Sequence, residues 1–392
     1  MTITMRRHIS CSDVHDLDNG VRKATLWTVD DKDAPALSDP LNPSGLRKPS
    51  RLVDIAKHAG VSSKTVSRVL NNEPYVTAAM RERVTRSVNE LGYVGDAAAS
   101  GLRSKKSGFI GLIIPDVRNG FFALLTRAIE ERLSPSSPTL LLGDSDEEQA
   151  QEERYLRTFR QQRVDGLIVL PCGAPSLPDA VMEIPTVIVD RTVPSVRGKA
   201  DHVMASNRKA AETLVAHMVN HHGMKQVAIV AGDLSISNVR ERQTGYSRIL
   251  KQAGLETFIT NGHTTPDDAA AGAYALFRTL TPPFGVFTTN NRMFWGAMAA
   301  IARLGLRIPK DVIVTTIDSI GEATVTGLQP TQAVVPVSTV AARAMQLLQE
   351  RISDPTLPPR TVTVDLDIEY GTTCGCVPLS TSPLMVGTAP PR

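Results

Sequence analysis

Residues 51–93 read RLVDIAKHAGVSSKTVSRVLNNEPYVTAAMRERVTRSVNELGY, and this stretch decides how the N-terminal part of the chain folds. Apolar side chains recur there at the spacing of one helix face, at Leu52, Ile55, Ala56 and Ala59. Gly60 follows where such a helix ends, and Ser62 can cap a second helix. The spacing therefore predicts two short helices joined by a tight turn.

The second of these helices has two different faces. Val66, Val69 and Leu70 are expected to point toward the first helix. The opposite face carries small polar and basic side chains, namely Ser63, Lys64, Ser67 and Arg68. A short second helix with a polar, slender outer face is typical of a helix-turn-helix, in which that helix enters the major groove of DNA.

Positive charge is concentrated around this motif. Residues 51–106 contain ten Lys and Arg against five Asp and Glu, whereas residues 1–50 contain seven of each. A third helix, with Val84, Val88 and Leu91 inward, completes a three-helix unit. Such a unit with a merely solvated polar face is the alternative, but the concentration of charge favours a surface that meets phosphates.

A different pattern begins at residue 107, where apolar runs of strand length alternate with amphipathic stretches of helix length. The expected strands cover 109–114, 139–142, 166–170, 185–190, 202–205, 227–230, 285–289, 311–317 and 362–370. The expected helices cover 121–133, 147–161, 207–221, 240–253, 292–304 and 338–353. This alternation predicts βαβ units with buried parallel strands. The expected fold class is an all-α headpiece followed by an α/β body of two lobes, each with a parallel sheet.

The segments between and around these patterns set the expected boundaries. Residues 1–50 lack periodicity and are expected to be a disordered leader, or else the product of an upstream start codon. The other expected parts are a DNA-binding domain at 51–95, a hinge or linker at 96–106, the body at 107–372 and a loose tail at 373–392. The sequence has neither a long apolar run nor a secretory signal, so a cytoplasmic location is expected.

The chemistry-bearing residues of the body do not predict an enzyme. The first strand is followed by DVRNGFF rather than by a dinucleotide fingerprint, and no Walker loop or nucleophile elbow occurs. Cys11, Cys172, Cys374 and Cys376 are too few and too scattered for a disulfide framework. The run CGC offers only two ligands and His221-His222 fits a solvated turn, so we expect no metal and no cofactor.

The N-terminal motif resembles the DNA-binding headpiece of the lactose-repressor (LacI-type) family, in the runs DIA, AGVS, TVSRVLN and LGY. The resemblance extends over residues 51–372. It implies that the second helix reads bases from its first turn, and that Asn71 and Tyr75 contact the DNA backbone. The DNA-binding residues expected from pattern and resemblance together are Ser63, Lys64, Ser67, Arg68, Asn71, Tyr75 and Leu102.

Leu102 belongs to the expected hinge. The resemblance implies that this segment folds on DNA and inserts a leucine into the minor groove, and Leu102 occupies that position. Family members commonly have Pro-Asn before the hinge helix, whereas this chain has Gly95-Asp96. Gly101 within the helix costs about 1 kcal/mol relative to Ala, so a looser hinge than usual is expected.

The body resembles the periplasmic sugar-binding fold, in which two lobes close over a ligand. The matching runs are PDVRNGFF, VIVDR, RERQTGY, FTTNN and TTIDSI. They place in the cleft Asn119, Phe121, Phe122, Asp190, Arg191, Arg242, Asn290 and Asp318. The resemblance implies that Asn119 bonds sugar hydroxyls and that the two Phe rings sandwich a sugar ring. Each residue has a purely structural alternative, such as Asp190 pairing with Arg191 at a strand end.

This set of cleft residues looks most like the ribose-binding version of the fold. Arg191 and Arg242 are expected to come from opposite sides of the cleft and to bond the same neutral polyol. Three departures from the family pattern, Gly120, Asn291 and Val335, leave the effector open. Ribose or another pentose is expected first, with a nucleoside, a hexose or a corepressor protein as alternatives.

The expected protein is a cytoplasmic, nucleoid-associated transcription regulator. We expect a repressor that binds a near-palindromic operator in double-stranded DNA as a homodimer. No leucine heptad follows Tyr370, so a tetramerising coiled coil is not expected. A sugar-transport protein is the competing class, but it would need export. Both release and strengthening of DNA binding by effector remain compatible with the sequence.

Overall fold

The computed structural model describes residues 50–70, 73–93, 107–133, 138–173, 177–178, 181, 183–318 and 327–376. The expected leader, apart from Ser50, and the expected hinge with Leu102 lie outside these residues, as does Asn71. The chain divides into two compact units, Met1–Val94 and Gly95–Arg392. No helix among the described residues is long and apolar enough to cross a membrane.

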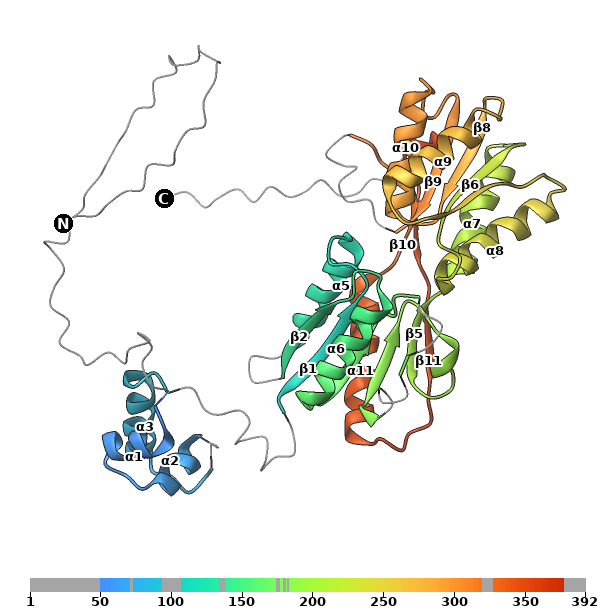
Figure 1. Ribbon diagram of the computed structural model, residues 1–392. Coiled ribbons are helices and arrows are strands. Elements are labelled where there is room, and N and C mark those ends of the chain that lie inside the picture. Colours follow the sequence, from blue (N-terminus) through green and yellow to red (C-terminus); the bar gives the residue numbers. More distant parts are fainter. Residues whose placement is uncertain are drawn as a thin grey trace, which may run out of the picture. The chain divides into compact units, whose positions relative to one another are not determined.

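The N-terminal unit is the predicted three-helix unit, with α1 (Leu52–Ala59), α2 (Ser63–Leu70) and α3 (Ala78–Glu90) (Figure 1). Gly60 ends α1 in the left-handed conformation that glycine favours, at φ 63°. The core is formed by the predicted inward residues Ile55, Ala56, Ala59, Val66, Val69 and Val84. Leu70 departs from the prediction, because 43% of its surface is exposed.

The first lobe of the body is built on a six-stranded parallel sheet in the order β11-β5-β4-β3-β1-β2. Its strands are β1 (Phe109–Ile114), β2 (Thr139–Asp144), β3 (Gly166–Val169), β4 (Thr186–Val189), β5 (Asp201–Ala205) and β11 (Thr361–Val364). Its helices are α5 (Gly120–Glu130), α6 (Gln149–Gln161) and α11 (Val337–Ser353). The strands β1, β3 and β4 are apolar and almost wholly buried, since helices cover both faces.

The second lobe repeats this plan with the strand order β12-β10-β9-β8-β6-β7. Its strands are β6 (Val227–Gly232), β7 (Phe258–His263), β8 (Phe284–Thr288), β9 (Val312–Ile317), β10 (Thr331–Val334) and β12 (Asp367–Glu369). Its helices are α7 (Asn207–Ala216), α8 (Ser237–Gln252), α9 (Pro266–Phe277) and α10 (Asn291–Arg303). The edge strand β12 runs antiparallel to β10, so this sheet is not purely parallel.

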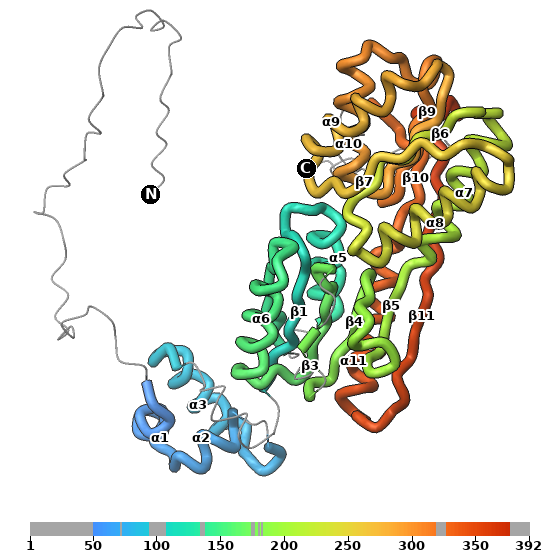
Figure 2. Tube along the Cα trace, turned by 45° about the vertical axis from the view of Figure 1, so that its right-hand side comes forward, coloured from blue at the N-terminus to red at the C-terminus, as the bar shows by residue number. Residues whose placement is uncertain are grey.

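The chain crosses between the lobes three times, after β5, after β10 and after β11 (Figures 1 and 2). The late strand predicted at 362–370 is therefore two strands, one in each sheet. After the second crossing, α11 packs against the first lobe although it follows a strand of the second. Because consecutive elements belong to different lobes, neither lobe is a continuous stretch of sequence.

A buried carboxylate ties the returning chain to the first lobe. Asp201 begins β5 and has no exposed surface. Its Oδ2 accepts hydrogen bonds from Arg351 of α11, at 3.1 and 3.0 Å. Its Oδ1 accepts from the backbone N–H of Arg360 at 2.9 Å and from the Arg360 guanidinium at 3.3 Å. One side chain thus connects β5, α11 and the start of β11.

One prediction about the C-terminal segment and one about the turn at His222 are wrong. Residues 373–376, expected in a loose tail, pack against the second lobe, and Thr373 and Cys374 are buried. His222, expected as a solvated turn residue, is half-buried and lies within 3.6 Å of the Cys376 sulfur. The remainder of the expected tail, residues 377–392, lies outside the described residues.

Candidate functional site

The outer face of α2 is the candidate DNA-binding surface of the N-terminal unit. The Ser62 hydroxyl accepts a hydrogen bond from the backbone N–H of Thr65 at 3.1 Å, which is the predicted N-cap. Ser63 and Lys64 follow in the first turn and are exposed. The small side chain of Ser63 leaves the backbone of the first turn accessible, as entry into a DNA groove requires.

Arg68 and Tyr75 extend this surface beyond the first turn. The Arg68 guanidinium lies 3.5 Å from a Glu73 carboxylate oxygen, and the side chains of both residues are 45% exposed. Such an exposed pair is worth little and can be exchanged for a phosphate or a base. Tyr75 is 89% exposed, which is unusual for an aromatic side chain without a partner molecule. Ser67 is half-buried beside them.

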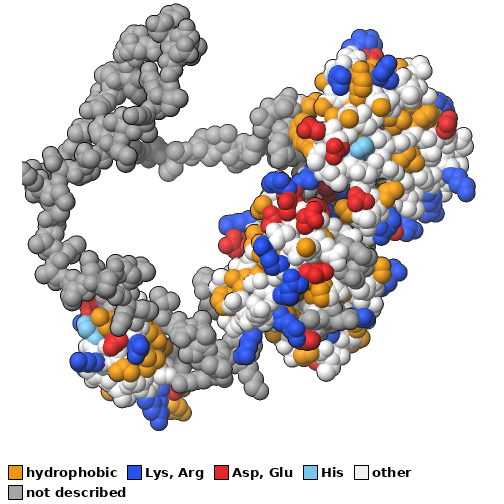
Figure 3. Space-filling view, in the orientation of Figure 1, with side chains coloured by type: hydrophobic (Ala, Val, Ile, Leu, Met, Phe, Trp, Pro, Cys, Tyr) orange, Lys and Arg blue, Asp and Glu red, His pale blue; other side chains and the backbone are white. Residues whose placement is uncertain are grey.

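All eight residues predicted for the cleft line one cavity of about 380 Å³ in the body. The polar residues among them follow the carboxyl ends of strands: Asn119 after β1, Asp190 after β4, Asn290 after β8 and Asp318 after β9. Parallel strands of both lobes end at this cavity, which is where open α/β sheets bind their ligands. Figure 3 shows acidic side chains gathered along the boundary between the lobes.

Asp190 and Asp318 occupy matching positions in the two lobes. Each directly follows a central strand, is 6% exposed, and has a left-handed backbone, with φ 63° and 78° respectively. Aspartate tolerates this conformation better than most residues, but it is still uncommon and clusters at functional sites. Burial raises the pKa of the Asp318 carboxyl, against the opposing effect of Arg242, and the charge of Asp190 adds to the rise.

Arg191 and Arg242 reach the cavity from different lobes, as predicted, but protein groups hold both of them. Arg191 donates two hydrogen bonds to Glu147, at 2.6 and 2.9 Å. Arg242 donates to Asn207 Oδ1 at 2.8 Å and to Asp318 at 3.4 Å. The structural alternative of Asp190 pairing with Arg191 is minor, since Arg191 Nε lies 3.8 Å from the carboxylate.

Phe121 and Phe122 form one wall of the cavity. Their ring centroids are 5.3 Å apart and the rings meet edge to face at 63°. Two consecutive rings in this arrangement have no room for a sugar between them, so the expected sandwich is wrong. Phe122 is almost fully buried in the first lobe's core, and the Arg191 guanidinium lies 5.5 Å from its ring centroid.

Asn119 and Asn290 are both helix N-caps. The Asn119 Oδ1 atom accepts from the backbone N–H of Phe121 at 3.1 Å, and the Asn290 Oδ1 atom accepts from that of Met293 at 3.0 Å. The helices α5 and α10 therefore begin at the cavity, one in each lobe. Their first turns place partial positive charge there, which favours oxygen-rich ligands.

Among the cavity residues that sequence reasoning missed, three are held by contacts that the fold creates. The Glu147 carboxylate accepts hydrogen bonds from Arg191. The Asn238 amide donates to Asp190 at 2.9 Å. The Arg292 guanidinium forms an ion pair with the buried Asp116 carboxylate. The last two contacts join the two lobes. Residue type alone gives no signal for them, because each partner is far away in the sequence.

Comparison with known proteins identifies the chain's relatives. A family model described as "Bacterial regulatory proteins, lacI family" matches residues 51–96, and one described as "Periplasmic binding protein domain" matches residues 110–351. The ribose operon repressor of Halalkalibacterium halodurans is 31% identical over 299 residues, which cover 76% of this chain and 89% of that protein. The catabolite control protein A of Priestia megaterium is 29% identical over 326 residues, or 81% and 97% of the two chains.

The fold has a close counterpart among solved structures. The lac repressor dimer bound to operator and the anti-inducer ONPF aligns with a TM-score of 0.71 at 22% identity, covering 83% of this chain and 99% of that chain. The helix-turn-helix unit and the two-lobed body are thus both found together in one known protein. The chain belongs to the lacI family of bacterial DNA-binding transcription regulators.

Proposed function

We propose that this repressor binds its operator as a homodimer and changes its DNA affinity when a small neutral polyol, first of all ribose or another pentose, occupies the cavity between the lobes. The cavity with two buried aspartates, one from each lobe, is the observation that carries this proposal. On the DNA side we assign base and phosphate contacts to Ser63, Lys64, Ser67, Arg68, Asn71 and Tyr75, and a minor-groove wedge to Leu102.

The charge of the cavity favours a neutral ligand. Six carboxylates line it, from Asp146, Glu147, Glu148, Asp190, Asp233 and Asp318, against four guanidiniums, from Arg118, Arg191, Arg242 and Arg292. A sugar phosphate would meet an excess of negative charge there. Carboxylates and guanidiniums are strong hydrogen-bonding partners for hydroxyl groups, and an aromatic wall suits the C–H face of a sugar.

The size of the cavity fits a monosaccharide. Small-molecule sites span roughly 300–1,000 Å³, and this cavity of about 380 Å³ lies near the lower end of that range. One relative, 31% identical, is named a ribose operon repressor, which supports a pentose weakly. A nucleoside or a hexose would fill more of the space, and both remain alternatives within the same proposal.

Calorimetry on the full-length protein tests the ligand class. Ribose, other pentoses, hexoses, nucleosides and ribose 5-phosphate are titrated in turn. We expect a neutral pentose to bind in a one-to-one ratio with the chain and more tightly than its phosphate. If no member of the panel binds, the cavity is not an effector site for these compounds, and control by a corepressor protein becomes the leading account.

Arg68 offers a test of the DNA surface. Arg68→Ala is expected to weaken binding to the specific operator by roughly fivefold to tenfold, at the lower end of the range for one DNA contact, because Arg68 must first leave Glu73. Arg86→Ala on α3 removes the same charge from another exposed Arg–Glu pair and serves as the control. The measurement is operator affinity by fluorescence anisotropy. Equal losses in both variants would remove Arg68 from the contact set.

A further inference from the structure

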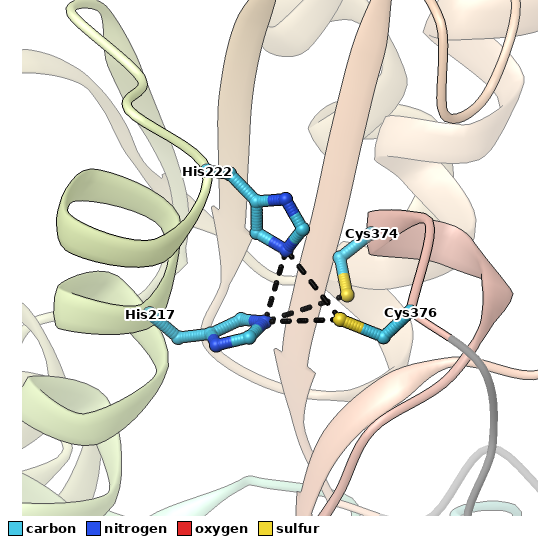
Figure 4. A group of neighbouring side chains, drawn as sticks. All are labelled: His217, His222, Cys374 and Cys376. Carbon is cyan, nitrogen blue, oxygen red and sulfur yellow. Dashed lines mark hydrogen bonds between the residues drawn. The ribbon is translucent and has the colours of Figure 1, made fainter.

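Four metal-binding side chains meet at the side of the second lobe, away from the residues that line the cavity. His217 and His222 come from the end of α7, and Cys374 and Cys376 come from the C-terminal segment (Figure 4). One donor atom of each lies within 4.8 Å of all the others. The four side chains point toward one common centre, and the two histidines are more than 150 residues away from the two cysteines in the sequence.

The backbone has an unusual conformation both where the two histidines lie and where the two cysteines lie. α7 ends in a π-helical turn, η3 (His217–His221), in which the His222 N–H donates to the His217 carbonyl at 3.2 Å. In an α-helix, residues five apart point about 140° away from each other, whereas this turn brings the two imidazoles together. Single π-turns occur frequently at functional sites.

The two cysteines are brought together by a glycine. Gly375 lies between them with a left-handed backbone at φ 85°, a conformation that L side chains rarely adopt. This turn lets Cys374 and Cys376 face the same imidazole. In an extended strand, residues i and i+2 also share a face. Here, however, a left-handed turn rather than a strand brings the two thiols together.

Four of the six distances between the donor atoms lie near those of a tetrahedral zinc site. Ligands at about 2.3 Å for sulfur and about 2.05 Å for nitrogen lie about 3.6 Å apart for a sulfur–nitrogen pair and about 3.3 Å apart for two nitrogens. Cys374 Sγ lies 3.6 Å from His217 Nε2, and Cys376 Sγ lies 3.5 and 3.6 Å from the Nε2 atoms of His217 and His222. The two Nε2 atoms are 3.0 Å apart.

A rigid frame holds the cysteine side of the group. The Thr373 hydroxyl donates to the Val314 carbonyl at 2.7 Å and accepts from the Thr331 N–H at 2.8 Å. The Thr331 hydroxyl lies 2.9 Å from Cys374 Sγ, where it can donate to a thiolate. A Cβ on Gly371 would overlap the Gln329 carbonyl, so this segment packs backbone against backbone. The cysteines are thus held in place by the central strands β9 and β10.

We propose that His217, His222, Cys374 and Cys376 bind one Zn²⁺ per chain in a closed tetrahedral site that fastens the C-terminal segment to α7. Four protein ligands leave no open position, so the site is structural. Binding converts both thiols to thiolates and releases two protons to the solvent, and neither the metal nor the protein changes its oxidation state. The proposal is independent of the effector cavity and of the ligand that occupies it.

Metal titration of the full-length protein tests the site. The reduced chain, freed of metal by a chelator, is titrated with Co²⁺ and then with Zn²⁺ in competition with a chromophoric chelator. We expect one Co²⁺ per chain with the intense visible bands of a tetrahedral thiolate complex, displacement by Zn²⁺, and a higher melting temperature. Cys376→Ser and His222→Gln are expected to weaken Zn²⁺ binding by at least about 100-fold, because each removes a direct ligand.

Two residues outside the ligand set provide matched controls. His221→Gln removes an imidazole that stacks on His217 but lies outside the ligand set, and Cys172→Ala removes a buried thiol of the first lobe. Both should keep stoichiometric binding, and circular dichroism shows whether each variant is folded. The proposal fails if the reduced wild-type chain binds less than one Zn²⁺ with micromolar or better affinity. It also fails if folded Cys376→Ser binds as tightly as the wild type.

Discussion

Replacing Asp201 with alanine is expected to lower the free energy of unfolding by roughly 3 kcal/mol. The carboxylate has no exposed surface and is the shared partner of Arg351 and Arg360. Without it, the Arg351 guanidinium, whose side chain is only 11% exposed, keeps its charge in the interior with backbone carbonyls as its remaining partners. This loss of stability lies at the low end of the range for removing one partner of a buried ion pair, because a third of the Arg360 side chain is exposed to water.

Denaturant unfolding of the full-length protein measures this effect. Asp365→Ala is the matched control, since it removes a carboxylate that pairs with Lys209 on the surface, where both side chains are more than 60% exposed. That control should lower the free energy of unfolding far less than Asp201→Ala does. Similar losses for the two variants would mean that Asp201 does not fasten α11 and β11 to the first lobe.

Asp318→Asn is expected to weaken pentose binding by roughly 10- to 100-fold, the value of one or two hydrogen bonds to a charged group. Asparagine accepts the left-handed backbone at this position and keeps the shape of the side chain. The change removes the charge that faces Arg242 and the cavity. Operator affinity in the absence of ligand should stay within about twofold, because the DNA surface belongs to the other unit of the chain.

Calorimetry with the best ligand of the panel measures the change in affinity. Asp311→Asn provides the control, because this carboxylate pairs with Arg307 on the surface of the same lobe, outside the cavity. An unchanged affinity in Asp318→Asn would show that the ligand does not contact the second lobe's aspartate. The assignment of the cavity residues by resemblance would then be wrong.

The sequence predicted the elements whose pattern is set locally. Central strands such as β1 and β8 are apolar runs because helices bury both faces, and α2 carries its two faces at regular helical spacing. The edge strand β7, FITNGH, was missed because it is largely exposed and polar. The helix α9, rich in alanine, was missed because small apolar residues on several faces give no clear amphipathic period.

The candidate sites divide in the same way. The eight cavity residues were predictable from the resemblance to the sugar-binding fold, and those that directly follow parallel strands come together because such strands bring their carboxyl ends to one place. Asn238 was not, because its contact with Asp190 depends on how the two lobes meet, and Glu147 was not, because its partner Arg191 lies 44 residues away in the first lobe. The group of His217, His222, Cys374 and Cys376 was missed for a related reason. The sequence suggests His221 and His222 as the pair, whereas the π-helical turn instead brings His217 beside His222.

One measurement tests the central claim most directly, namely the operator affinity of the full-length protein with and without a saturating neutral pentose. The account predicts a change of at least about tenfold, in either direction, which corresponds to a coupling free energy of about 1.4 kcal/mol. It also predicts that Asp318→Asn needs a correspondingly higher pentose concentration for the same change. The account would be contradicted if none of the compounds that bind the protein changed its operator affinity.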